Sequence, residues 1–198
     1  NYDIVDWILG TESTANETFS SSEQNLVSNY SINGGALFVS GTEIAWDLDF
    51  KGTATDKNFF WNFLKSEYIN DAPNNQANVY YKAEGISGTD FSDLININYD
   101  NGTQGTYNVS YPDVINGRNG GVNILKYSGL TTLNVAAVAY KGNFGSGVSS
   151  GAVVNFGFPF ETIYPESKRF EIMNKVMHYL ENLTDISEEF DYHPDEFI

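Results

Sequence analysis

The sequence predicts one α/β domain whose sheet is mostly parallel and which carries a β-rich insertion. Apolar, β-branched runs flank a helical stretch near the start of the chain, and two more such runs precede a helical stretch near its end. A strand–helix–strand order of this length is typical of a right-handed crossover between parallel strands. The stretch between these two parts is rich in Gly, Asn, Asp and Tyr, which favours short strands and hairpins.

The first strand–helix–strand unit opens the chain. Residues 3–9 are apolar and end at a glycine, which predicts a buried strand. Ser20 and Glu23 have the spacing of a capping box, so we expect a helix to begin there and to end at the Asn-Gly-Gly break of residues 33–35. The continuous apolar run of residues 36–40 predicts a second strand.

The middle of the chain predicts one more helix and then the insertion. Asp56 is expected to cap this helix, whose apolar face comprises Phe59, Phe60, Phe63 and Leu64. Residues 71–78 are polar and predict a turn region. The insertion covers about residues 79–131, with a tight turn at residues 100–102.

The last part returns to the α/β pattern. Residues 132–140 and 152–158 predict two strands joined by a loop of small residues, 142–151. Pro165 suits the first turn of a final helix. Its core-facing stripe is expected to comprise Phe170, Met173, Val176 or Met177, and Leu180.

The sequence also predicts how the chain is divided and that it belongs to a longer protein. We expect residues 1–184 to form the domain and residues 185–198 to be an acidic tail. The chain opens directly into an apolar run without a Met start or a signal peptide, so we expect a mature or excised piece of a longer protein. Its partners would then include neighbouring domains of that protein.

The charge and cysteine content narrow the function classes. The formal net charge is -16, and a chain this acidic repels phosphate backbones and anionic lipid surfaces. Nucleic acid is therefore not expected as a partner, whereas neutral glycans and cations are. The absence of cysteine excludes thiolate nucleophiles, disulfides and cysteine-type metal sites. No apolar run reaches about 18 residues, so we expect no transmembrane segment. No motif predicts a cofactor.

Three segments together resemble a known family: residues 2–13, 33–48 and 155–163, the last followed by a helix. They are similar to the class I glutamine amidotransferase-like domain of secreted, xanthan-lyase-related multidomain proteins of Bacteroides-type bacteria. The resemblance implies a flavodoxin-like three-layer sandwich and a secreted, periplasmic or cell-surface location. It also implies carbohydrate-related neighbours.

The same resemblance implies where a catalytic site would lie. Active members carry a Cys at a strand-to-helix elbow, and a His and a Glu after a late strand. The elbow here would be residues 38–43, with Ser40 or a neighbour at the nucleophile position. Glu161 matches that Glu, but Pro159 and Phe160 occupy the region of the His. Without the Cys and the His, the usual triad chemistry is not available.

The residues themselves suggest three groupings. Ser40, Thr42 and Glu43 form an elbow after a buried strand. The elbow is either a nucleophile or ligand-binding turn, or a small-residue turn whose hydroxyls satisfy the backbone amides of the next helix. Glu12, Glu43 and Glu161 all follow strand ends, so they either converge on one rim as acid/base groups or each order a loop. Trp46, just past the elbow, is the best surface candidate for stacking on a sugar.

Other patterns favour structural roles. Asp47 and Asp49 have part of the spacing of a calcium loop, but the remaining ligands are misplaced, so we predict a solvated turn and no metal site. His178 and His193 are far apart in sequence and match no zinc motif.

Two functions remain open at this stage. The first is a non-catalytic structural or glycan-binding module of a secreted polysaccharide-processing protein. The alternative is a hydrolase that acts on an ester, amide or glycosidic bond. It would use Ser40, or the carboxylate rim of Glu12, Glu43 and Glu161.

Overall fold

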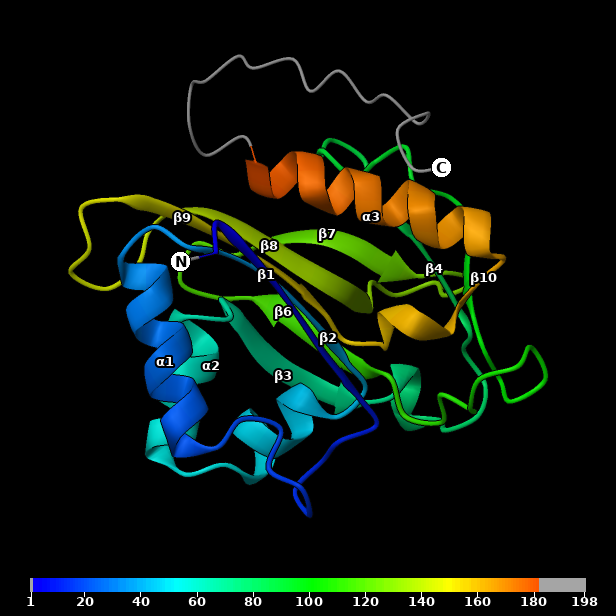
Figure 1. The fold of residues 1–198 in the computed structure, drawn as a ribbon. Helices are drawn as coiled ribbons and strands as arrows, with labels where there is room; N and C mark the ends of the chain where they lie inside the picture. Colours follow the sequence, from blue (N-terminus) through cyan, green and yellow to red (C-terminus); the bar gives the residue numbers. More distant parts are fainter. Residues whose placement is uncertain (1, 182–198) are drawn as a thin grey trace, which may run out of the picture.

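The structure is a computed structural model that describes residues 2–181. One mixed sheet of ten strands forms its centre, with helices α1 (Ser21–Ile32) and α2 (Ala54–Asn62) on one face and α3 (Glu166–Glu181) on the other (Figure 1). In chain order, the strands are β1 (Ile4–Gly10), β2 (Ala36–Gly41), β3 (Ser66–Asp71), β4 (Lys82–Gly85), β5 (Ile97–Tyr99), β6 (Asp113–Gly117), β7 (Val122–Tyr127), β8 (Val135–Asn143), β9 (Ser150–Phe156) and β10 (Ile163–Tyr164).

The sheet is mainly antiparallel. Its main path runs β1-β2-β9-β8-β7-β4-β5-β10, and β6 and β3 form a second branch that leaves β8. Only the pairs β1–β2 and β2–β9 are parallel, whereas all the other strand pairs among the described residues are antiparallel. With this branching, the sheet curls into a half-barrel.

The expected flavodoxin-like sandwich with a mostly parallel sheet is therefore wrong. Residues 144–149 alone join β8 to β9, and a connection this short makes a hairpin, because a parallel crossover needs a dozen or more residues. The stretch expected as a β-rich insertion supplies β4, β5, β6 and β7, which extend the same sheet.

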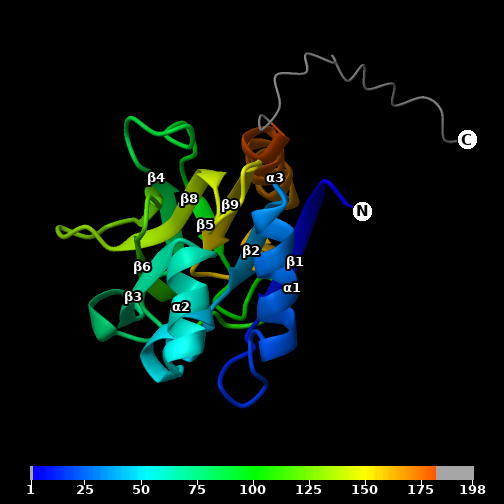
Figure 2. The same cartoon turned by 90° about the vertical axis from the view of Figure 1, so that its left-hand side faces the viewer.

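The first two helices begin at capping boxes. The Ser20–Glu23 box is confirmed, because the Ser20 side chain accepts from the Glu23 amide and the Glu23 carboxylate accepts from the Ser20 amide. In α2 the cap is Thr53, and Asp56 completes the box three residues later, so the expected cap was misplaced. Figure 2 shows α1 and α2 next to each other.

Two expected core faces differ from the structure. Strand β1 forms an edge of the sheet, and only Leu9 within it is buried, so it is not the buried strand that its apolar run predicted. In α3 the buried stripe is Ile172, Val176 and Leu180, whereas the side chain of Phe170 is 63% exposed.

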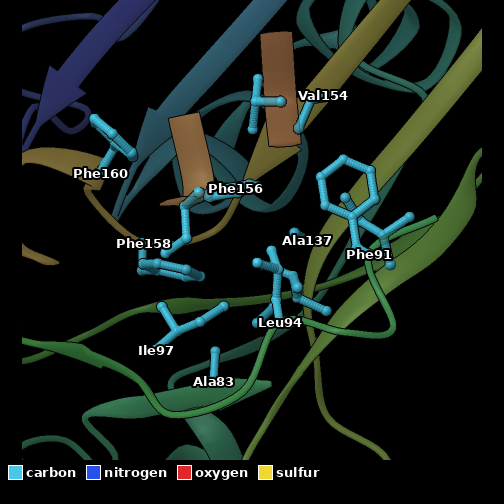
Figure 3. Close-up of a cluster of buried hydrophobic side chains, with 14 of the residues drawn as sticks. Ala83, Phe91, Leu94, Ile97, Ala137, Val154, Phe156, Phe158 and Phe160 are labelled. Carbon is cyan, nitrogen blue, oxygen red and sulfur yellow. The ribbon is translucent and has the colours of Figure 1, made fainter. Parts of the chain in front are cut away.

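The two faces of the sheet bury separate apolar clusters. The cluster beneath α3 is rich in phenylalanine and includes Phe91, Phe156, Phe158 and Phe160 (Figure 3). The other cluster packs the sheet against α1 and α2 through residues such as Val27 and Phe60. Burial of both faces explains why the strands of the centre read as continuous apolar runs.

The expected tail, residues 185–198, and His193 lie outside the described residues. Within residues 2–181, no helix is long and apolar enough to cross a bilayer.

Candidate functional site

The candidate site follows the carboxyl end of β2, where the chain turns from the sheet into a short helix. Gly41 fits this turn because a Cβ atom there would lie 3.0 Å from Ile44 and 3.1 Å from Leu9. The Thr42 amide donates to the Gly10 carbonyl at 3.0 Å, and the Thr42 hydroxyl donates to the Tyr111 carbonyl. The turn is thereby fastened to the end of β1 and to the segment before β6.

Ser40 lies inside β2 and is fully buried. Its hydroxyl accepts a hydrogen bond from the Phe160 amide at 3.3 Å. This contact links β2 to the segment after β9. The hydroxyls of Ser40 and Thr42 thus hydrogen-bond backbone atoms of distant segments.

Glu43 is half-buried and has carboxylates as neighbours. Ser13 donates to one of its carboxyl oxygens at 3.4 Å. Burial raises the pKa of Glu43 to about 7, and the charges of Asp71 and Asp47 act in the same direction, while the Ser13 hydrogen bond opposes them. This carboxyl group can therefore exchange a proton near neutral pH.

Two further carboxyl groups complete this acidic cluster, and sequence reasoning missed both. Asp71 ends β3, and Asp113, which begins β6, is its partner in the strand register. Asp113 is fully buried, and its Oδ2 accepts from the amides of Ala45 at 2.7 Å and Trp46 at 3.3 Å. Asp113 therefore caps the helix that carries Trp46.

The cluster resists full ionisation. Burial raises the pKa of Asp113 well above its ordinary value, and Glu43 adds to this effect; burial also raises the pKa of Asp71. The Oδ1 atoms of Asp71 and Asp113 are both buried, and neither has a hydrogen-bond partner among residues 2–181. Each of these carboxyls is thus harder to ionise than an ordinary carboxyl in water.

Aromatic rings lie beside the acidic cluster. Trp46 begins a π-helix, Trp46–Lys51, and its ring stacks on Phe50 with centroids 4.6 Å apart. Tyr68 of β3 contacts both rings, and Phe50 is 52% exposed. The Nζ atom of Lys51 lies 4.8 Å from the centroid of the Trp46 ring. We call Glu43, Asp71, Asp113, Trp46, Phe50 and Tyr68 the acidic–aromatic site.

The other two predicted carboxylates, Glu12 and Glu161, have contacts of their own. Glu161 accepts a hydrogen bond from the Tyr107 hydroxyl. Burial raises the pKa of Asp6, and the charge of Glu161 adds to this effect. Glu12 is exposed, and its amide donates to the Leu9 carbonyl at 3.0 Å. In the part of the chain that the structure describes, no hydrogen bond joins Glu12, Glu43 and Glu161 to one another.

The expected solvated turn at Asp47 and Asp49 is instead part of the π-helix and its contacts. Asp47 accepts from the amide and the hydroxyl of Thr18, at 2.9 Å and 2.8 Å. Asp49 is buried and accepts from the Tyr68 amide at 2.7 Å. Among residues 2–181, no group of three or more His, Asp or Glu residues is placed to hold a metal ion.

Comparison with known proteins gives similarity at the level of the fold. No protein-family model matches the sequence, and neither does a curated protein. A β-galactosidase from Rahnella sp. R3 matches with a TM-score of 0.50 at 12% identity, over 90% of this chain and 22% of that one. Gan42B, a GH42 β-galactosidase from G. stearothermophilus, matches with a TM-score of 0.50 at 13% identity, over 89% of this chain and 21% of that one.

A third match is of a different kind. The N-terminal domain of mmIFT52 has a TM-score of 0.51 at 18% identity, over 86% of this chain and 75% of that one. Identities this low establish a shared fold alone. The chain spans about a fifth of the length of the β-galactosidases it matches, and none of the three matches is described as a glutamine amidotransferase.

Proposed function

We propose that this chain is a non-catalytic module of a larger, secreted polysaccharide-processing protein and that it binds a neutral glycan at the acidic–aromatic site. The observation that carries the proposal is the stack of Trp46 on Phe50, a partly exposed pair of rings next to two carboxyl groups that are not fully buried, Glu43 and Asp71. Aromatic rings pack against the apolar face of a sugar, and carboxyl oxygens accept hydrogen bonds from its hydroxyls.

Charge supports a neutral ligand. The acidic cluster repels an anionic sugar at this site. That glycoside hydrolases contain a domain of this fold, as about a fifth of their length, is consistent with a module that works beside other domains. A structural role between such neighbours is the form of the proposal that would remain if the site bound no sugar.

One observation favours hydrolysis as the second candidate. A carboxyl with a pKa of about 7, as in Glu43, is suited to general acid/base catalysis at neutral pH. Against it, Asp113 is fully buried and Ser40 is enclosed within the sheet, so neither can touch a substrate without movement of the backbone. Glu43 and Asp71 would have to carry the reaction alone.

The test is the binding of neutral oligosaccharides, measured by calorimetry on the wild type and on Trp46→Ala. We expect the wild type to bind at least one neutral glycan and Trp46→Ala to lose about tenfold or more in affinity, because the stacking surface is removed. Phe170→Ala, which removes an exposed ring from the opposite face, is the matched control and should bind like the wild type. Equal binding by wild type and Trp46→Ala would overturn the site, and turnover of a glycan that Glu43→Gln abolishes would replace binding with hydrolysis.

A further inference from the structure

A second concave region lies on the α3 side of the sheet, far from the acidic–aromatic site. A cavity of about 230 Å³ is lined by residues of α3, β8 and the connection between β4 and β5: Asp90, Lys141, Lys175, His178 and Tyr179. A neighbouring cavity of about 200 Å³ shares Asp90 and Tyr179 and adds Gly88, Thr89, Val122 and Ile124. We call the two cavities together the α3 groove.

The α3 groove and the acidic–aromatic site lie at opposite ends of the central strands. Lys141 pairs with Ala152, near the start of β9. The acidic–aromatic site follows the end of β2, where Ser40 pairs with Phe156 at the end of β9. A ligand of the size of one sugar residue in the groove would therefore not touch the acidic–aromatic site, and the two sites can be tested independently.

The groove places two lysines of a strongly acidic chain beside two carboxylates, Asp90 and Asp93. The sequence has 10 Lys and Arg residues against 26 Asp and Glu, and two of the ten line this one cavity. Lys175 forms an ion pair with Asp93 at 2.9 Å. Lys141 has no carboxylate within ion-pair distance among residues 2–181, and its Nζ lies 4.0 Å from the centroid of the Tyr179 ring.

The surroundings of Lys141 favour an anion that would sit beside its ammonium group. Burial lowers the pKa of Lys141, and the charge of Asp90 only partly opposes this. A partly desolvated ammonium group without an ion-pair partner gains most from a bound carboxylate, because the cost of removing water from the ammonium has already been met by folding.

The rest of the groove indicates what the anion is attached to. Val122 and Ile124 give the second cavity an apolar wall, whereas Asp90 and Thr89 offer oxygen acceptors beside it. Each cavity is smaller than the roughly 300 Å³ at which ligand pockets usually begin, which limits the occupant to about one small ring. A carboxylate, an apolar ring face and several hydroxyls are combined in an acidic monosaccharide.

We propose that the α3 groove binds one acidic sugar residue, with its carboxylate at Lys141 and Lys175 and its ring over Val122 and Ile124. This site is separate from the acidic–aromatic site, and it binds an acidic sugar where that site binds a neutral one. A protein with both sites would hold a mixed polysaccharide at two points, one on a neutral residue and one on an acidic residue.

The experiment is a titration of the isotope-labelled full chain with sodium glucuronate, followed by amide chemical shifts at constant ionic strength. We expect saturable shifts in the millimolar range for amides of residues 88–90 and 175–179. Glucose, which lacks the carboxylate, and acetate, which lacks the ring, should each bind about tenfold more weakly or not at all. Glucose that binds as well as glucuronate would overturn the role of the lysines, and acetate that binds as well would overturn the sugar.

Variants assign the interaction to Lys141. Lys141→Met keeps the length of the side chain without its charge and should weaken glucuronate binding by about tenfold, whereas Lys141→Arg should keep most of it. Lys57→Met removes a lysine from α2, on the other face of the sheet, and should bind like the wild type. If Lys141→Met does not fold, Lys175→Met serves in its place. Unchanged binding in the folded Lys-to-Met variant of the groove, or an equal loss in Lys57→Met, would overturn the proposal.

Discussion

Carboxyl groups of the acidic–aromatic site differ in what surrounds them. Asp113 is fully buried and accepts hydrogen bonds from two backbone amides at the start of the helix that carries Trp46. Glu43 is only half-buried, and the hydrogen bond that its carboxyl group accepts from Ser13 is long at 3.4 Å. Asp113 is therefore a positioning residue for the rings, whereas Glu43 is the group that can exchange protons with solvent.

We expect Glu43→Gln to flatten the dependence of stability on pH. The pKa of Glu43 rises from 4.5 to about 7 on folding, so the folded state holds a proton that the unfolded state has released. The stabilisation is complete below about pH 4.5 and is lost as the pH rises through 7. The glutamine side chain of the variant cannot ionise, so the variant does not lose this stabilisation. Between pH 4.5 and a pH above 7, the unfolding free energy of the variant should therefore rise by about 1–2 kcal/mol relative to that of the wild type, allowing for solvent screening.

Urea unfolding of both proteins at several pH values from 4.5 to 8 measures this difference. Glu12→Gln is the control, because Glu12 is exposed and its substitution should leave the pH profile unchanged. Parallel profiles of the wild type and Glu43→Gln would show that this carboxyl is not the buried acid described above.

Sequence reasoning could find the site residues that follow an obvious apolar strand, and no others. Glu43 and Trp46 come just after the apolar run of β2, so their position at a strand end could be predicted. Asp71 was placed in a polar turn and Asp113 in an insertion without a register. Only the pairing of β3 with β6 brings these two together, and that pairing has no signal in local sequence.

At the scale of elements, α3 shows how a helical pattern can offer two stripes. Phe170, Met173, Val176 and Leu180 have helical spacing, and so do Ile172, Val176 and Leu180. The structure buries the second set against the sheet and exposes Phe170. Hydrophobic size alone could not distinguish the two, because the choice depends on which way the helix faces the sheet.

This difference gives a paired prediction for stability. Ile172→Ala should lower the unfolding free energy by about 2–5 kcal/mol, because it removes a fully buried side chain from the α3 cluster. Phe170→Ala should change it by about 0.5 kcal/mol or less, because most of that ring is in water. Thermal or urea unfolding of both variants checks this. A larger loss from Phe170→Ala than from Ile172→Ala would mean that the helix is turned the other way.

The length of the connection between β8 and β9 determines whether these two strands are parallel or antiparallel. Apolar strands buried on both faces look parallel in sequence, because each face lacks the polar alternation of a half-exposed strand. Here both faces of an antiparallel pair are covered, by α3 on one side and by α1 and α2 on the other. The short loop over residues 144–149 was the deciding observation, since only a hairpin closes it.

At the scale of the whole molecule, the class of secondary structure was predictable and the strand order was not. The helices α1, α2 and α3 and the strands β2, β8 and β9 all lie where the sequence placed them, within a few residues. The order in the sheet depends on pairs distant in sequence, such as β2 with β9 and β3 with β6. Such pairs are decided by packing after the elements have formed, so local patterns do not encode them.

The branched sheet has a consequence for how the molecule opens. Strand β8 pairs with β9, β7 and β6, so both branches of the sheet and both apolar clusters include it. No part of the sheet can then detach from β8 without exposing a core that the other parts share, and such a strand should open only on global unfolding. We expect the amides of Ala137–Tyr140 to exchange with deuterium most slowly, at a rate set by the full unfolding free energy, while the edge strand β1 exchanges through local fraying.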